Sequence, residues 1–192
     1  MESMNKYLRI FFLLFLIGFT GGVLCSNYLR VSAGYDTSLL GIYMAGQGTE
    51  TILQSQLFGY LLKKRGRWFL FYFISGMTPF GVPLVWGGIL WLAFLAGNLM
   101  TAFLLEYGLE GILTGIICLF PQGLFYLPAV FLLFFFVLQM SQKFWQTQGR
   151  VRGDYGAYFF FMTGIFVIFL LGIFMESYVN QKVLHYVAQH RL

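Results

Sequence analysis

Few side chains in this chain could form a catalytic site. Ser75 precedes Gly76 in an apolar stretch, and a serine can act as a nucleophile when a base lies beside it. The histidines are His185 and His190, both in a polar segment near the carboxyl end, so neither is placed to activate Ser75 at membrane depth. The sequence therefore argues against an intramembrane serine protease.

Metal and nucleotide sites also lack the residues they need. His185 and His190 are five positions apart, a spacing that does not stack on one helical face. No glycine-rich phosphate-binding loop is present. Cys25 and Cys118 lie in apolar surroundings, where we expect packing roles and no disulfide. We predict no catalytic residue, no metal ligand and no cofactor, and hence a protein that is not an enzyme.

Three polar residues lie in or beside apolar segments: Asn98, Gln122 and Glu176. For Asn98 and Gln122 we expect hydrogen bonds to neighbouring helices and to backbone groups freed by prolines. An intramembrane carboxylate can mark an ion path, but Glu176 ends an apolar stretch and is expected among lipid headgroups. A small transporter, or the membrane subunit of one, is the alternative function.

The composition indicates that most of this protein lies in a lipid membrane. Of 192 residues 59% are hydrophobic and 10% are charged, and the mean hydropathy is +0.76. We predict an all-α, polytopic integral membrane helix bundle, with residues 1–192 forming a single membrane domain. The net charge of +5 comes with no aromatic-interleaved basic groove, so nucleic acid binding is not expected.

The first half of the chain predicts one span and a loop. Residues 10–24 are apolar and read as an uncleaved first span, with Gly18 and Gly22 forming a GxxxG face for close helix packing. Residues 26–67 are predicted as an extramembrane loop with an amphipathic helix that leads into the basic residues 63–67. We interpret the basic residues as anchors facing anionic headgroups.

Residues 68–105 are long enough for two crossings. The prolines near residues 77–83 predict a kink or interruption, since they remove backbone donors. The second crossing, residues 86–105, carries a stripe of small residues at Ala93, Gly97 and Thr101, and residues 106–110 form a short acidic turn.

Residues 111–140 open with a second GxxxG pair, Gly111 and Gly115. Pro121 and Pro128 then predict either one long kinked helix or two half-helices that meet near Pro121. A hydrophilic linker, residues 141–154, precedes the last span, residues 155–175. The total is about five spans with proline-broken helices, or six if each broken segment crosses. The lysines and arginines near the span ends do not decide the orientation.

The order of these features resembles the stage II sporulation protein M family over nearly the whole chain. The resemblance rests on a Gly-x-x-x-x-Gly-x-Pro turn from Gly76 to Pro83, on LFPQGLFYLP at residues 119–128, and on a final span that ends at Glu176. Family members often carry asparagine after the Pro-Gln pair, where this chain has Gly123. The expected structural or interaction residues are Gly76, Pro79, Gly81, Pro83, Asn98, Gly111, Gly115, Pro121, Gln122, Pro128 and Glu176.

The resemblance implies a nonenzymatic membrane scaffold of endospore formation. Such a scaffold is made in the mother cell and recruits two peptidoglycan hydrolases, stage II sporulation proteins D and P, to the septum during engulfment. The expected partners are therefore membrane lipid and these membrane-anchored hydrolases. The protein is expected to be a multi-pass protein of the mother-cell membrane. A homo-oligomer is a further alternative.

Overall fold

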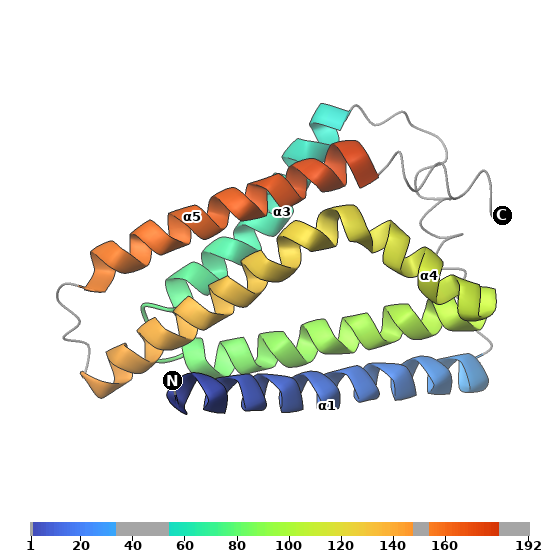
Figure 1. Ribbon diagram of the computed structural model, residues 1–192, viewed down its shortest axis with the longest axis horizontal. Helices are drawn as coiled ribbons and strands as arrows, with labels where there is room; N and C mark the ends of the chain where they lie inside the picture. The colour runs from blue at the N-terminus through green and yellow to red at the C-terminus, as the bar shows by residue number, and fades with distance from the viewer. Residues whose placement is uncertain (1, 34–53, 148–153, 181–192) are drawn as a thin grey trace. The chain divides into compact units, whose positions relative to one another are not determined.

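The computed structural model describes residues 2–33, 54–147 and 154–180, and these ranges are almost entirely helical (Figure 1). The described residues contain no strand, which confirms the all-α prediction. The elements are α1 (Glu2–Ala33), α3 (Gln54–Ser75), α4 (Gly81–Gln146), α5 (Asp154–Phe174) and a π-helical segment, η1 (Met175–Asn180).

Four helical segments among the described residues are long and apolar enough to cross a membrane. They are Arg9–Tyr28, Gly81–Leu105, Gln122–Gln146 and Tyr155–Val179. Large apolar side chains on these segments face outward, as Leu127 and Phe160 do with exposed fractions of 75% and 77%. Such exposure would be unfavourable in water and is ordinary in lipid. The membrane helix bundle is confirmed.

The helices form two compact units. The first contains α1 and the part of α4 from Trp86 to Ile116, and the second contains α3, the remainder of α4, α5 and η1. The prediction that one membrane domain includes the whole chain is not tested by this division, because both units are helical and α4 runs through both.

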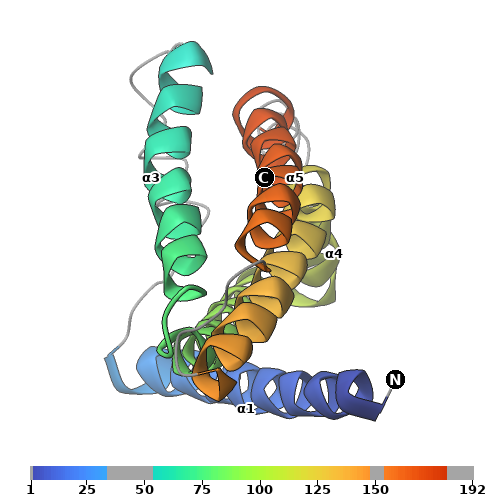
Figure 2. The ribbon, with the colours of Figure 1, turned by 90° about the vertical axis from the view of Figure 1, so that its left-hand side faces the viewer.

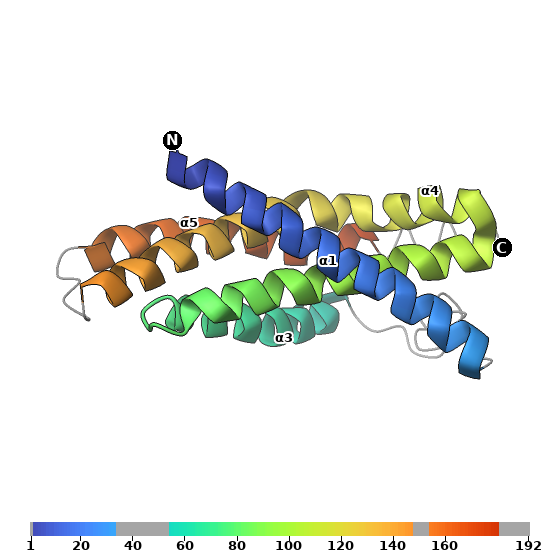
Figure 3. The ribbon, with the colours of Figure 1, turned by 90° about the horizontal axis from the view of Figure 1, so that it is seen from below.

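In the first unit, α1 lies directly against the early part of α4, and Figure 3 shows α1 crossing it obliquely. A β-carbon added at Gly18 would lie 2.6 Å from the Leu90 carbonyl oxygen, and one added at Gly22 would collide with the Phe94 carbonyl oxygen. One added at Gly97 would collide with the Phe19 carbonyl oxygen. The predicted GxxxG face of α1 therefore packs on the predicted small-residue stripe of α4.

The order of these contacts shows that α1 and α4 run parallel in the first unit. Gly18 meets Leu90, and Gly22, one turn later, meets Phe94. Between α1 and α4 the structure describes α3, which is not among the four apolar segments because the basic residues 63–67 interrupt it. The four candidate spans are roughly consistent with the predicted count of about five. Of the two crossings predicted for residues 68–105, the described residues contain one, Gly81–Leu105, since the turn at residues 76–80 ends the first apolar run too early.

The predicted interruption near residues 77–83 is confirmed as a turn between α3 and α4. The turn, residues 76–80, is closed by backbone hydrogen bonds from Met77 to Ile74 and from Thr78 to Ser75, both 3.0 Å long. Pro83 lies in the first turn of α4, where a missing backbone N–H has no helical partner to lose. Both α1 and α3 extend into residues 26–67, since α1 ends at Ala33 and α3 begins at Gln54.

The break inside α4 lies at Gly108, in the predicted acidic turn, with φ 65° and ψ −149°. Glycine adopts this conformation without the steric cost that a β-carbon brings. Pro121 and Pro128 have helical neighbours on both sides, so the prediction of two half-helices meeting at Pro121 is wrong and the long-helix alternative is observed. The predicted linker also begins too early, because α4 continues to Gln146.

Aromatic side chains fill the interior of the second unit. Phe69 of α3 lies 5.0 Å from Phe166 and 5.6 Å from Phe169 of α5, measured between ring centroids. Tyr72 lies 5.0 Å from Phe134 of α4. Figure 2 shows α3, α5 and the later part of α4 as the separate helices that these rings join. Aromatic pairs of this geometry add specific orientation to the packing.

Candidate functional site

The most polar contacts of the second unit gather around Glu176, the first acidic residue of η1. One carboxylate oxygen, Oε1, forms an ion pair with the Arg65 guanidinium of α3. The other, Oε2, accepts a hydrogen bond of 2.8 Å from the Tyr126 hydroxyl of α4. The Arg65 guanidinium carbon also lies 4.4 Å from the centroid of the Tyr126 ring. Each of these three residues contacts the other two.

This cluster is partly shielded from its surroundings. The Glu176 side chain is 12% exposed and the Arg65 side chain is 37% exposed. A carboxylate in such a place is stabilised when both of its oxygens have donors, and here both do. The cation over the tyrosine ring adds a further attraction. The cluster therefore joins three helical segments, α3, α4 and η1, through one carboxylate.

A second set of polar contacts lies further along the same helices. The Ser141 hydroxyl donates a 2.7 Å hydrogen bond to the Thr78 carbonyl, and the Tyr158 hydroxyl donates a 2.8 Å bond to the Phe73 carbonyl. Tyr126 and Ser141 are about 22 Å apart along α4 at the usual helical rise. Polar contacts therefore join the helices of the second unit at two levels, one at Glu176 and one at Ser141 and Tyr158. The aromatic packing lies between these two levels.

Two predicted glycines make this second level possible. A β-carbon at Gly76 would collide with the Tyr158 hydroxyl, and one at Gly81 would lie 2.8 Å from both the Ser141 β-carbon and the Ser75 carbonyl oxygen. The Gly-x-x-x-x-Gly-x-Pro turn is therefore a place where helices approach each other closely. Pro79 lies within the turn itself.

Asn98 and Gln122, both predicted to form hydrogen bonds with neighbouring groups, lie in different surroundings. The Asn98 backbone nitrogen lies 3.0 Å from where a β-carbon of residue 22 would stand, so Asn98 belongs to the α1–α4 contact of the first unit. The Oε1 atom of Gln122 is buried and has no hydrogen-bond partner among the described residues. A hydrogen bond donated to that oxygen, as expected, is therefore not found among the described residues.

For the remaining predicted residues, the structure shows mainly the helix to which each belongs. Gly111, Gly115 and Pro121 lie in α4 beyond Gly108, and their contacts are outside the described side chains. Pro128 lies in α4 with an exposed ring. His185, His190 and most of the predicted loop lie outside the described residues.

Sequence reasoning missed four residues of these contacts: Arg65, Tyr126, Ser141 and Tyr158. Arg65 was one of several basic residues in a run, and only the fold separates it from its neighbours. Ser141 was assigned to a hydrophilic linker, yet its side chain is fully buried. The signal that could have found Ser141 is its helical continuity with the apolar run before it, since Ala129, Leu133 and Val137 precede it at spacings of four.

The groups of the cluster bond to one another. Both carboxylate oxygens of Glu176 have donors, and the Tyr126 hydroxyl donates to one of them. The Ser75 hydroxyl donates to the Tyr72 carbonyl at 2.7 Å within its own helix. No group of three or more His, Cys, Asp or Glu residues that could hold a metal ion occurs in the described ranges. Cys25 carries a free thiol.

Comparison with known proteins gives one match. A family model described as Stage II sporulation protein M matches residues 11–181. Searches of curated proteins and of solved structures found no match. The matched range includes most of both compact units and the whole Arg65–Tyr126–Glu176 cluster. This family is not a known enzyme family, and its name places the protein in sporulation. Because the match includes most of the 192 residues, the chain belongs to the stage II sporulation protein M family.

Proposed function

We propose that this sporulation membrane protein is a nonenzymatic scaffold. It would recruit peptidoglycan hydrolases, stage II sporulation proteins D and P, to the mother-cell membrane at the septum, where they remodel peptidoglycan during engulfment of the forespore. The family match over residues 11–181 carries this proposal. The hydrolases are the partners that family membership suggests.

The geometry of the second unit supports a scaffold. A protein that presents a surface to partner spans must hold its helices in one arrangement, and polar contacts at two levels supply that rigidity. The outward side chains of α5, including Phe159, Phe160 and Val167, are large and apolar. In lipid such a face is available for a partner helix that offers close complementary packing.

The case for transport is weaker than the sequence suggested. Discontinuous helices that meet at mid-membrane are typical of secondary transporters. The segment 119–128 was one of two candidates for such a break, and it is helical in α4. The other, near residues 77–83, is a turn that connects α3 to α4. The described residues thus lack the pair of half-helices that motivated the alternative.

A localisation experiment tests the proposal. In an endospore-forming host, the gene is deleted and fluorescent fusions of the two hydrolases are followed at the septum. We expect the hydrolases to disperse in the deletion strain while their isolated catalytic activity persists. We also expect both to copurify with the tagged full-length protein. If neither hydrolase moves nor copurifies, the scaffold proposal fails, and ion or solute flux in proteoliposomes becomes the next measurement.

A further inference from the structure

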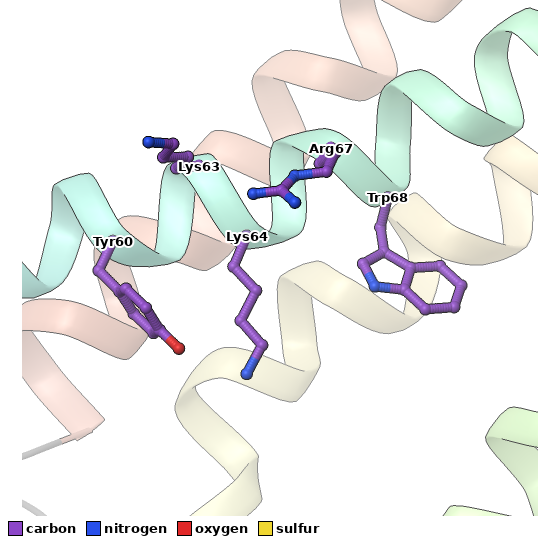
Figure 4. A pocket seen from close by; sticks show the side chains of 5 residues that line it. All are labelled: Tyr60, Lys63, Lys64, Arg67 and Trp68. Carbon is purple, nitrogen blue, oxygen red and sulfur yellow. The ribbon is translucent and has the colours of Figure 1, made fainter.

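α3 carries a second group of basic residues that the Arg65–Tyr126–Glu176 cluster does not use. Lys63, Lys64 and Arg67, together with the aromatic residues Tyr60 and Trp68, line an open pocket of about 270 Å³ (Figure 4). Their positions follow a stripe of i, i+3, i+4, i+7 and i+8, so one continuous strip of the helix surface provides all five. Figure 4 shows Tyr60, Lys64 and Trp68 projecting from the same side of α3.

Within the described residues, the three cations of this pocket have no carboxylate partner. In the ranges that the structure describes, the ion pair formed from this basic run is Arg65 with Glu176, and no carboxylate pairs with Lys63, Lys64 or Arg67. The Lys64 ammonium lies 5.7 Å from the centroid of the Tyr60 ring, which holds the charge near the pocket. Three positive charges within two helical turns favour an anion with more than one negative group.

The neighbours of the pocket in the second unit indicate how deep in the membrane it lies. Arg65 is level with Glu176, which lies three residues before the end of the apolar segment Tyr155–Val179. Beyond Trp68, α3 is apolar and packs on α5 through Phe69. Tyr60 and Trp68 are 60% and 54% exposed, one on each side of the cations. Exposed tryptophan and tyrosine beside lysine and arginine are typical of the membrane interface.

We propose that the pocket lined by Tyr60, Lys63, Lys64, Arg67 and Trp68 is a discrete binding site for the phosphate headgroup of an anionic lipid. A headgroup with two phosphates, as in cardiolipin, can meet more than one of these cations and should bind more tightly than a headgroup with one. A lipid fits better than a soluble phosphate, because the exposed Trp68 ring and the apolar part of α3 adjoin the cations where acyl chains begin. This site is independent of the proposed scaffold function.

Native mass spectrometry of the full-length protein tests the site. The purified protein in detergent is titrated with cardiolipin, phosphatidylglycerol or phosphatidylcholine, and retained lipid molecules are counted. We expect one saturable cardiolipin site, weaker phosphatidylglycerol binding and no saturable phosphatidylcholine binding. Arg67→Gln should weaken cardiolipin binding about fivefold, the loss of one near-surface charge. Lys64→Arg, which keeps the charge, should bind as the unmodified protein does.

Arg9→Gln is the matched control, because Arg9 is an exposed basic residue at the start of another apolar segment. We expect Arg9→Gln to leave cardiolipin binding unchanged. Equal weakening by Arg9→Gln and Arg67→Gln would overturn the site in favour of diffuse attraction. Phosphatidylcholine binding as tight as that of cardiolipin would also overturn it. Complete competition by equimolar inorganic pyrophosphate would show a soluble-anion site and overturn the lipid assignment. Circular dichroism confirms that each variant is folded.

Discussion

The two compact units hold their helices together by different means. In the first, α1 and α4 meet where glycines remove the side chains between them, and the hydroxyls of Thr20 and Thr101 bond to carbonyls of their own helices. In the second, side chains reach from one helix to another, as Tyr158 does to Phe73 and Tyr126 to Glu176. The first unit depends on the absence of side chains, and the second adds polar contacts of its side chains to the close approaches at Gly76 and Gly81.

The difference follows from what lipid can and cannot do. Because acyl chains are as apolar as leucine, helices in a bilayer gain little from hiding apolar surface and must associate through close packing or hydrogen bonds. Close backbone packing cannot yield when an atom is added, whereas a polar contact can be lost while the surrounding aromatic packing remains. We therefore expect substitutions in the first unit to have the larger effects.

The largest effect is expected for Gly22→Ala. The added β-carbon would collide with the Phe94 carbonyl oxygen, which belongs to the backbone and cannot rotate away. We expect a loss of about 3 kcal/mol in the free energy of unfolding, the upper part of the range for overpacking. Gly21→Ala is the control, because its β-carbon would stand 3.9 Å from a Phe94 ring carbon. Reversible unfolding in mixed micelles measures both, and equal stabilities would contradict the close-packing account.

The next effect is expected for Glu176→Gln, which leaves the Arg65 cation without its carboxylate. Removing one partner of a fully buried pair costs more, but Arg65 is 37% exposed and solvent screens part of the loss. We expect about 2 kcal/mol. In a double-mutant cycle, Arg65→Gln should cost less in the Glu176→Gln background than in the unmodified protein, with only its contact with the Tyr126 ring left to lose. Additive losses would show that the two side chains do not act as a pair.

A smaller effect is expected for Ser141→Ala, which removes a buried hydroxyl and leaves the Thr78 carbonyl without that donor. Hydrogen bonds between segments of membrane proteins average about 0.6 kcal/mol, and this one is fully buried at its donor, so we expect about 1 kcal/mol. Thr163→Ala serves for comparison, since the Thr163 hydroxyl bonds to a carbonyl of its own helix and is exposed. If the two variants unfold at the same detergent fraction, the second level of polar contacts has no role in stability.

The smallest effect is expected for Tyr126→Phe. The ring remains under the Arg65 guanidinium, and Arg65 still pairs with Glu176, so only one hydrogen bond is lost. We expect about 0.6 kcal/mol, the average measured for such bonds between membrane helices. Tyr178→Phe is the control, because the Tyr178 ring stacks on Phe174 and the substitution keeps that contact. A loss as large as that of Glu176→Gln would mean that Tyr126, and not Arg65, is the main partner of the carboxylate.

The sequence alone predicted those features that depend on the residues of a single helix or turn. Apolar runs predicted the spans, and the small residues of two runs, Gly18 with Gly22 and Ala93 with Gly97, predicted the faces that meet in the first unit. The turn at residues 76–80 was predicted because prolines and glycines act locally. These features depend on residues close together in the chain.

The sequence was insufficient where distant residues meet. Arg65 and Glu176 are separated by 111 positions, and nothing in the basic run distinguishes Arg65 from Lys64. Proline at position 121 predicted a break, yet the helix continues there and breaks at Gly108, where glycine permits a positive φ. Proline removes one hydrogen bond, and a long apolar helix can tolerate that loss.

The central claim is that the pairing of Arg65 with Glu176 fixes the arrangement of helices on which the proposed recruitment of hydrolases depends. Septal localisation of the fluorescent stage II sporulation protein P fusion tests it in strains carrying Glu176→Arg, Arg65→Glu or both, with protein levels matched by immunoblot. We expect each single charge reversal to disperse the fusion, and the double reversal to restore much of the septal signal. Normal localisation in both single variants, or a double variant as defective as the singles, would contradict the account.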